Sequence, residues 1–225
     1  MFCRIFRLKC LKWDRALGIV VGDIRTVRQE KRSGSARRSG KEERGVRMRV
    51  RGDNMQRIAK FEKVSFEQFK KDWQGEHPQD TDDMIKEIYD GIRLPKRATA
   101  GSAGYDFFAP AAFTLKPGQM TKILTGIRAR IDDGWVLKLY PRSGLGFKFR
   151  LQLNNTVGII DSDYYGSDNE GHIQVKLTND SREGKTVEVE AGTGFSQGIF
   201  VEYGITVDDE ADEVRNGGFG STTRA

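Results

Sequence analysis

Residues 172–177 are HIQVKL, and this stretch decides the fold class because its apolar and polar residues alternate strictly. Alternation puts the apolar side chains on one face of a β-strand and the polar ones on the other. TVEVE at 186–190 repeats the pattern. Other strand-like segments occupy 113–115, 122–131 and 135–140, and glycine-bearing turns separate them at 116–118, 132–134 and 183–184. Many short strands without a long helix between them predict an all-β sandwich or barrel over residues 92–225.

The preceding residues, 55–91, have helical signals. Residues 65–68 (SFEQ) have the form of a capping box, and Phe66, Phe69 and Trp73 give the following helix one apolar face. Thr81 can cap a second helix with two acids in its first turn, which Gly91 ends. We expect a short helical segment that serves packing.

Residues 1–54 differ from the rest in charge. They carry 16 Lys/Arg against 6 Asp/Glu, a net charge of +10, whereas residues 55–225 carry 22 against 26, a net charge of −4. The polar stretch at 31–41 has too little apolar area to order itself. We predict a disordered basic leader over 1–54, and the acidic body indicates no nucleic-acid partner.

We also expect that the leader is not part of the working protein and that translation starts at Met55. Codons for residues 51–55 can hold a purine-rich element just ahead of an ATG, as a bacterial ribosome-binding site does. A mitochondrial transit peptide is the rival interpretation, but the leader's six acidic residues oppose it, since such peptides are acid-poor. A genuine disordered basic tail is the remaining alternative.

Composition narrows the cellular setting. The chain is 37% hydrophobic and 31% charged, and the apolar run at 19–21 is far shorter than a membrane span or a signal-peptide core. We therefore expect a cytoplasmic protein without a membrane partner. Cys3 and Cys10 are the only cysteines, so the body folds without disulfides, and their spacing without a nearby His matches no common zinc pattern.

Five glycine-marked segments interrupt the β pattern. In chain order they are AGYD at 103–106, PRSGLG at 141–146, NTVGIIDSDY at 155–164, GFSQG at 194–198 and RNGGFGST at 215–222. Arg-Ser-Gly on a tight turn offers a guanidinium, a hydroxyl and backbone N–H groups to phosphate oxygens. Asp161 and Asp163 point to one face if they lie on a strand, although a turn there alters this. Taken singly each segment is an ordinary turn, loop or tail, so their joint occurrence carries the argument.

This combination resembles the trimeric dUTP diphosphatase (dUTPase) family of bacterial or phage type, over about residues 92–225. The third segment is the most specific. The resemblance implies a β jelly roll or distorted barrel with a C-terminal arm at 212–225, and a homotrimer with active sites between subunits. It implies hydrolysis of dUTP to dUMP and pyrophosphate by water attack on the α-phosphorus. This reaction keeps uracil out of DNA and supplies dUMP for dTMP synthesis.

The resemblance also assigns roles residue by residue. Asp161 is implied to orient the water, and Tyr164 to pack under deoxyribose, which leaves no room for a 2′-hydroxyl. Asn155, Ile159 and Ile160 are implied to bind uracil, the isoleucines through their backbone, and a site of fixed donors and acceptors rejects cytosine. The implied phosphate contacts are Arg142, Ser143, Gly144, Gln197 and Arg215. Phe219 is implied to stack over uracil beside Gly220 and Ser221, and Asp106 to have a supporting role. The implied cofactor is Mg²⁺, bound by the substrate's phosphates and water without direct side-chain ligands.

Two departures from the family pattern stand out. Residues 167–170 (SDNE) lengthen the third motif, so either Gly166 or Gly171 is the family's glycine. If it is Gly171, the backbone of Gln174 falls where a pyrimidine contact is made. The fifth motif is one residue shorter between Arg215 and its Gly-Phe-Gly, which leaves the reach of Arg215 open.

Two other functions remain as alternatives. A dCTP deaminase shares the fold, but the strand at 172–177 lacks the glutamate that deamination uses. A phage-type regulatory protein would bind dUTP and act on a partner, with the basic leader as its carrier.

Overall fold

The computed structural model of this 225-residue chain describes residues 13–14, 19–20, 55–213 and 215–216. The chain divides into two units, Met1–Arg49 and Val50–Ala225. In the first unit, β1 (Trp13–Asp14) pairs antiparallel with β2 (Ile19–Val20). The other residues of 1–54, for which we predict disorder and a translation start after the leader, lie outside the described part of the chain.

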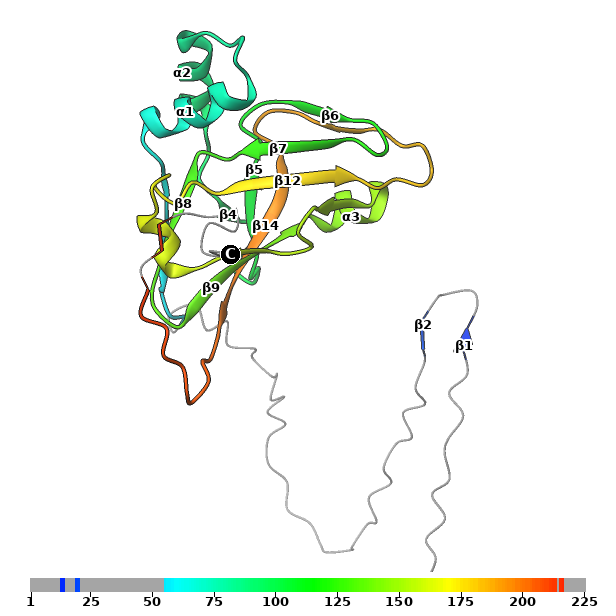
Figure 1. Ribbon diagram of the computed structural model, residues 1–225. Helices are drawn as coiled ribbons and strands as arrows, with labels where there is room; N and C mark the ends of the chain where they lie inside the picture. Colours follow the sequence, from blue (N-terminus) through cyan, green and yellow to red (C-terminus); the bar gives the residue numbers. More distant parts are fainter. Residues whose placement is uncertain (1–12, 15–18, 21–54, 214, 217–225) are drawn as a thin grey trace, which may run out of the picture. The chain divides into compact units, whose positions relative to one another are not determined.

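The second unit is mostly β-sheet (Figure 1). A five-stranded sheet has the order β11-β9-β14-β5-β4 and a three-stranded sheet the order β10-β12-β7, while β13 pairs with β6 and β3 with β8. The strands are β3 (Ala59–Lys63), β4 (Lys96–Arg97), β5 (Tyr105–Phe108), β6 (Phe113–Leu115), β7 (Met120–Leu124), β8 (Ile127–Ile131), β9 (Trp135–Pro141), β10 (Leu151–Leu153), β11 (Gly158–Ile160), β12 (Gln174–Asn179), β13 (Val187–Val189) and β14 (Gly194–Glu202). The prediction of an all-β fold over residues 92–225 is confirmed in part, because the described part of this region is mostly β-sheet but also contains two short helices.

Apolar and polar residues that alternate in the sequence are alternately buried and exposed in the strands. Val175 and Leu177 of β12 are buried while Lys176 between them is exposed, and β13 buries Val187 and Val189 around Glu188. The predicted single strand at 122–131 is instead two strands, because Gly126 turns the chain with φ +68°. A Cβ at Gly126 would lie 2.3 Å from Ile92 Cδ1, so this turn needs glycine.

Both predicted helices are present. α1 (Phe66–Glu76) and α2 (Asp82–Gly91) contact each other above the strands in Figure 1. Ser65 Oγ accepts a hydrogen bond from Gln68 N at 3.1 Å, and Thr81 Oγ1 accepts one from Met84 N at 3.4 Å, as the capping signals predict. The segment 55–91 is not wholly helical, however, since β3 pairs along the full length of β8.

Two expected turns are short helices. α3 (Ser143–Phe149) begins where the sequence indicates a tight turn, and the 3₁₀-helix η1 (Ser162–Gly166) follows Asp161. Asp161 and Asp163 therefore do not share a strand face, and the turn alternative holds. Within the described ranges, every helix is too short or too polar to cross a membrane.

Candidate active site

Two cavities contain most of the predicted site residues that the structure describes, but Asp161 lines neither. A cavity of 420 Å³ is lined by Asp106, Arg142, Ser143, Gly144 and Gln197. A second, of 690 Å³, is lined by Asn155, Ile159, Ile160, Tyr164, Gln174 and Arg215. Among the described residues, the two linings share no member. We call them the phosphate cavity and the nucleoside cavity after the groups that they suit chemically.

Sheet register assembles the phosphate cavity. On β14, Gln197 lies opposite Asp106 of β5 on one side and Tyr140 of β9 on the other. Its amide Nε2 donates to the Pro141 carbonyl at 3.1 Å, directly before the Arg-Ser-Gly segment. Three segments far apart in the sequence thus meet at one place on the sheet.

A guanidinium and a helix start face this cavity. Arg142 Nε lies 3.1 Å from Asp106 Oδ1, and its Nη1 donates to the Gly194 carbonyl at 3.3 Å. Ser143 and Gly144 form the start of α3, where backbone N–H groups lack intrahelical partners and can bind phosphate oxygens. These donors suit an anion.

Glycines leave room for the polar side chains. A Cβ at Gly194 would lie 2.8 Å from Arg142 Nη1, and one at Gly104 would lie 3.0 Å from Gln197 Oε1. The first and fourth glycine-marked segments are therefore needed for the placement of Arg142 and Gln197.

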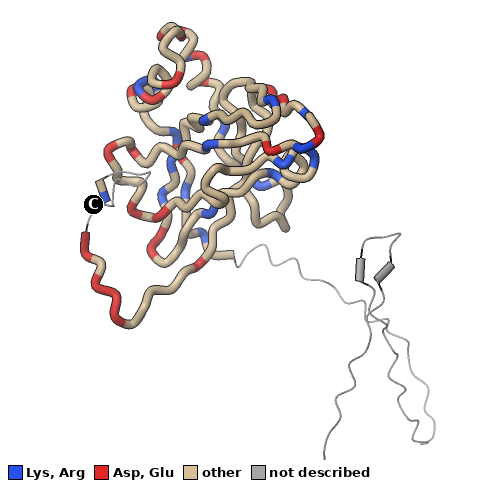
Figure 2. Tube along the Cα trace, turned by 45° about the vertical axis from the view of Figure 1, so that its right-hand side comes forward, with Lys and Arg blue, Asp and Glu red and all other residues tan. Residues whose placement is uncertain are grey.

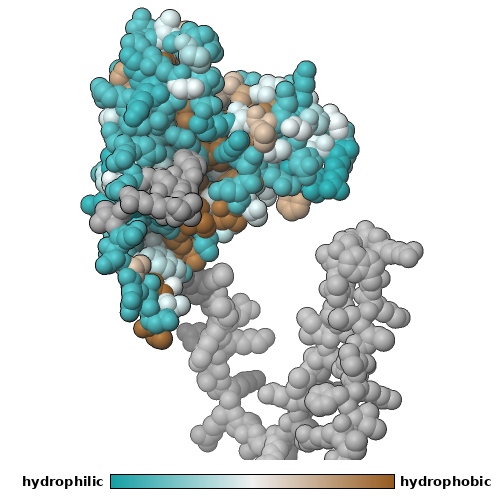
Figure 3. Space-filling view, viewed as in Figure 1, coloured by the Kyte–Doolittle hydropathy of each residue, from teal (hydrophilic) through white to brown (hydrophobic). Residues whose placement is uncertain are grey.

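The nucleoside cavity is bounded by β10, β11 and the turn between them, and by the start of β12. Gly158 pairs with Leu139 of β9, and a Cβ on Gly158 would lie 3.0 Å from the Leu139 Cβ. Ile159 is 51% exposed, an unusual position for a large apolar residue. Apolar side chains interrupt the hydrophilic surface on the face in Figure 3. A partly apolar slot edged by backbone groups suits a flat, polar-edged ring.

Tyr164 is fixed at the bottom of this slot. Only 5% of the residue is exposed. Its hydroxyl donates to the His172 carbonyl at 3.0 Å and accepts from Asn169 Nδ2 at 2.8 Å. Burial raises the pKa of the Tyr164 hydroxyl, so the residue stays neutral at physiological pH.

Asp161 directly follows the cavity-lining Ile160 and contacts Arg215 of the arm. Its side chain is 41% exposed and its Oδ2 lies 2.5 Å from Arg215 Nη2, while Arg215 Nε lies 2.9 Å from Asp163 Oδ1. Acidic residues dominate the exposed stretch 208–213 that leads to Arg215 (Figure 2). Arg215, expected at terminal phosphates, thus lies between two carboxylates in this chain. Phe219, Gly220 and Ser221 lie outside the described residues.

The two candidate glycines of the lengthened third motif differ in structure. Gly171 has φ +69°, and a Cβ there would lie 2.6 Å from the Tyr164 carbonyl oxygen. A Cβ on Gly166 would meet nothing within 4 Å. Glycine is needed only at Gly171, and Gln174 three residues later lines the nucleoside cavity, as that alternative requires.

Sequence reasoning missed several lining residues. Lys122 of β7 and Lys176 of β12 are register partners and both line the nucleoside cavity, with Asn154 beside them. The Lys122 ammonium forms an ion pair with Glu76 of α1. No local motif marks these positions, because strand pairing alone brings them to the cavity.

These two cavities define a class. One presents cationic and backbone donors for phosphate oxygens and the other a slot for a base over a buried tyrosine, so the fold and site are those of a nucleotide-binding protein. Residues 90–223 match the family model described as dUTPase. The chain belongs to the dUTPase family.

The chain is similar to several proteins of known name. A deoxyuridine 5′-triphosphate nucleotidohydrolase of Lactococcus lactis is 43% identical over 135 residues, which cover 59% of this chain and 89% of the relative. One from Hahella chejuensis is 40% identical over 147 residues, covering 62% and 92%. A solved dUTPase from Streptococcus mutans is 33% identical, with a TM-score of 0.49 over 66% of this chain and 98% of that one.

Proposed function

We propose that this chain is a dUTP diphosphatase that hydrolyses dUTP to dUMP and pyrophosphate at a site formed by the two cavities. The activity keeps uracil out of DNA and provides dUMP for dTMP synthesis. Membership of the dUTPase family and the names of the two bacterial relatives support it. The observation that carries most weight is Tyr164, buried beside the β11 edge where a nucleoside would lie.

The nucleoside cavity selects the base and the sugar. Asn155 and the backbone of Ile159, Ile160 and Gln174 offer fixed donors and acceptors to uracil. Cytosine presents the opposite groups at that edge and would leave buried partners unpaired, which costs more than a lost contact. The Tyr164 ring supports deoxyribose and excludes a 2′-hydroxyl by its bulk.

The phosphate cavity holds the triphosphate for in-line attack. Arg142, the first turn of α3 at Ser143 and Gly144, and Gln197 bind phosphate oxygens. Asp106 supports Arg142 through their 3.1 Å contact. Catalysis of this kind is mainly positioning and charge stabilisation.

Asp161 acts on the attacking water. Its carboxylate accepts a hydrogen bond from the water and takes a proton as the new oxygen–phosphorus bond forms. The bond to the α,β-bridging oxygen breaks, and pyrophosphate leaves with its electron pair. In the substrate complex, the Arg215 side chain moves from Asp161 and Asp163 to the terminal phosphates. Phe219 then covers the base, with Gly220 and Ser221 beside it.

The family's cofactor fits this donor set. Within the described ranges, no three His, Cys, Asp or Glu side chains come together as a metal-binding group. The cavities instead offer sites for phosphates, whose oxygens and water are the ligands that Mg²⁺ prefers. When bound, Mg²⁺ would neutralise phosphate charge, with phosphate oxygens and water as its ligands.

The division into two cavities supports a homotrimer. Each cavity provides half of a nucleotide site, and the described residues show no lining shared between them. In a jelly-roll trimer, the phosphate cavity of one subunit faces the nucleoside cavity of its neighbour, and the arm closes the site. Sedimentation of the native protein tests this assembly.

Turnover of four nucleotides tests the activity. With Mg²⁺ we expect pyrophosphate release from dUTP and little from dCTP, dTTP or UTP. Ammonia release from dCTP would indicate the deaminase alternative. Tight dUTP binding without turnover would indicate a purely regulatory protein, and either result contradicts the proposal.

A further inference from the structure

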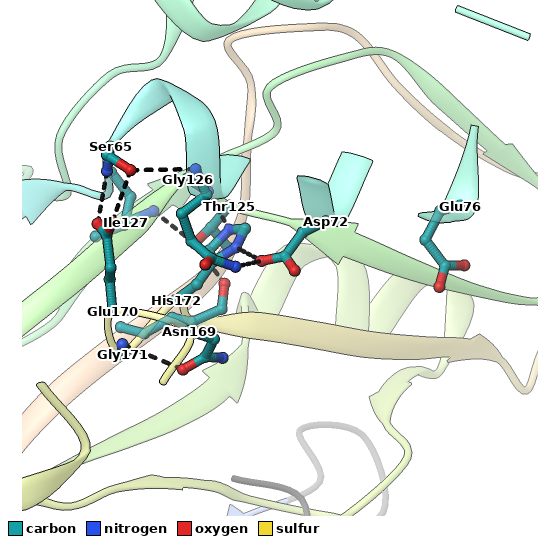
Figure 4. Close-up of polar contacts among 12 residues, drawn as sticks. Ser65, Asp72, Glu76, Thr125, Gly126, Ile127, Asn169, Glu170, Gly171 and His172 are labelled. Atoms are coloured by element: carbon teal, nitrogen blue, oxygen red, sulfur yellow. Dashed lines mark hydrogen bonds and ion pairs between the residues drawn. The ribbon is translucent and has the colours of Figure 1, made fainter. Parts of the chain in front are cut away.

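Helix α1 and its N-cap contact the β domain near the nucleoside cavity at three points, and Figure 4 shows Ser65, Asp72 and Glu76, which make these contacts. Its N-cap Ser65 contacts Glu170 of the lengthened third motif, through Ser65 N at 2.7 Å and Ser65 Oγ at 2.6 Å. Asp72 contacts His172, and Glu76 pairs with the cavity-lining Lys122. Asp72 and Glu76 are four residues apart and so lie on the same helix face.

His172 joins α1 to the β domain. The residue is fully buried, and Gly126 N donates to its Nε2 at 2.8 Å. Nε2 is therefore the acceptor, so the ring proton is on Nδ1, which donates to Asp72 Oδ2 at 2.5 Å. Gln68 Nε2 donates to the same carboxylate oxygen at 2.9 Å, which fixes Asp72 from within the helix.

Tyr164 is held by the same residue. Its hydroxyl donates to the backbone carbonyl of His172, whose side chain is anchored on Asp72. On the other side Asn169 donates to the Tyr164 hydroxyl, and its Oδ1 accepts from Gly171 N at 3.2 Å. The tyrosine ring is thus connected to α1 by a short series of hydrogen bonds.

The lengthened third motif has a role in this arrangement. Asn169 and Glu170 belong to the extra residues 167–170, and they contact Tyr164 and Ser65 respectively. Glu170 has φ +56°, a left-handed conformation that an L-residue adopts at a cost. The contacts with Ser65 hold it there.

We propose that α1 is a positioning element of the nucleotide site and that Asp72, acting through His172, sets the place of the Tyr164 ring and so the preference for deoxyribose over ribose. Asp72 is a positioning residue that does not contact the substrate. The proposal rests on the proposed function, because it assumes that the sugar packs on Tyr164.

The test compares kcat/KM for dUTP and UTP in the full chain. In Asp72→Ala the imidazole loses its acceptor, and we expect the dUTP:UTP ratio to fall about tenfold, the value of one fixed contact in a discriminating pocket. Asp72→Asn keeps an oxygen that accepts from Nδ1 and should stay within about twofold of the wild type. This rescue by a conservative variant separates positioning from charge.

Two controls separate positioning from stability. Ile85→Val weakens the packing of α2, because Ile85 is fully buried, and Ile85 takes no part in the hydrogen bonds of the His172 side chain. Asp82→Ala removes a surface ion pair with Lys70 of α1. Both should keep the wild-type ratio even where the melting temperature falls.

Each possible outcome supports or overturns the inference. An unchanged ratio in folded Asp72→Ala overturns the inference, as does an equal fall in Ile85→Val. If Asp72→Ala does not fold, Asn169→Ala and Glu170→Gln, which change partly exposed residues of the same network, must lower the ratio or the inference is wrong. Failure of the wild type to hydrolyse dUTP would instead remove the proposed function.

Discussion

Ser65 and Glu170 lie 105 residues apart in the chain, yet the Glu170 carboxylate accepts from both the backbone N and the Oγ of Ser65. In a capping box the residue three positions after the cap would bind that backbone N–H. Gln68 instead donates its side chain to Asp72. The start of α1 is therefore capped partly by a residue from the third motif, which ties the helical segment to the site.

This contact makes the stability of the fold depend on pH. Burial alone would raise the pKa of Glu170, but the hydrogen bonds from Ser65 outweigh it and hold the pKa below its ordinary value of 4.5. A carboxyl whose pKa is lower in the folded state stabilises the fold above its ordinary pKa and loses that effect as pH falls through the folded value. We expect Glu170→Gln to lower the unfolding free energy at pH 7 by about 1 kcal/mol. Its stability should also fall less steeply than the wild type's below pH 4.5.

Denaturant titrations at several pH values measure this effect. Glu188→Gln is the matched control, because Glu188 lies on the exposed face of β13. A Glu170→Gln profile parallel to that of the wild type at every pH would show that the contact does not contribute.

Gly194 should matter for activity more than for stability. A Cβ there would lie 2.8 Å from Nη1 and 3.2 Å from Cδ of Arg142, the far part of a flexible side chain that can move. We expect Gly194→Ala to fold normally and to lose about 10- to 100-fold in kcat/KM, as removal of a charge-assisted hydrogen bond to phosphate costs. Gly101→Ala is the control, since its Cβ meets nothing within 4 Å. Equal kinetics in the two variants would remove Arg142 from the phosphate site.

Asp161→Asn should separate binding from chemistry. The amide keeps the shape of the carboxylate but cannot take a proton from water, and loss of a positioned base typically costs about 10²–10⁴-fold in rate. Calorimetric binding of a non-hydrolysable dUTP analogue should persist. Asp133→Asn, at an exposed neighbouring turn, is the control. Near-normal turnover of Asp161→Asn would exclude the residue from the mechanism.

Much of this fold can be predicted from the sequence where an element depends only on residues close to it in the chain. Alternation predicts the buried faces of β12 and β13, and the caps Ser65 and Thr81 predict where α1 and α2 begin. These signals act within a few residues, so no partner needs to be known. The joint order of five motifs likewise predicts residues that line the two cavities.

The features that the sequence did not predict depend mostly on residues far apart in the chain. HIQVKL suggests that His172 faces solvent with Gln174 and Lys176, but it is fully buried because Asp72, 100 residues away, accepts a hydrogen bond from its Nδ1. β3 has one large apolar residue, Phe61, and forms only because β8 pairs with it. α3 contains two glycines in seven residues, so propensity alone favours a turn over a helix.

Tyr164→Ala should narrow the preference for dUTP over UTP. Removing the ring opens space for a 2′-hydroxyl, so the ratio of kcat/KM values should fall more than tenfold, beyond what loss of one contact gives. Tyr164→Phe is the informative partner, because it keeps the ring but loses the bonds with His172 and Asn169. We expect an intermediate ratio for it. A wild-type ratio in Tyr164→Ala would exclude the ring from sugar discrimination.

Truncation after Glu213 tests the arm. The deleted part contains Arg215, whose guanidinium lies against Asp161 and Asp163, and Phe219, which is proposed to cover the base. The buried core lies between Val64 and Phe195, so the shortened chain should keep its melting temperature within a few degrees. Turnover should fall about 10²–10³-fold, because a cationic donor to developing phosphate charge is lost together with the closing ring. Arg215→Ala in the full chain should reproduce the part of the loss that belongs to the guanidinium. Full activity in the truncated chain would mean that the shortened fifth motif takes no part in catalysis.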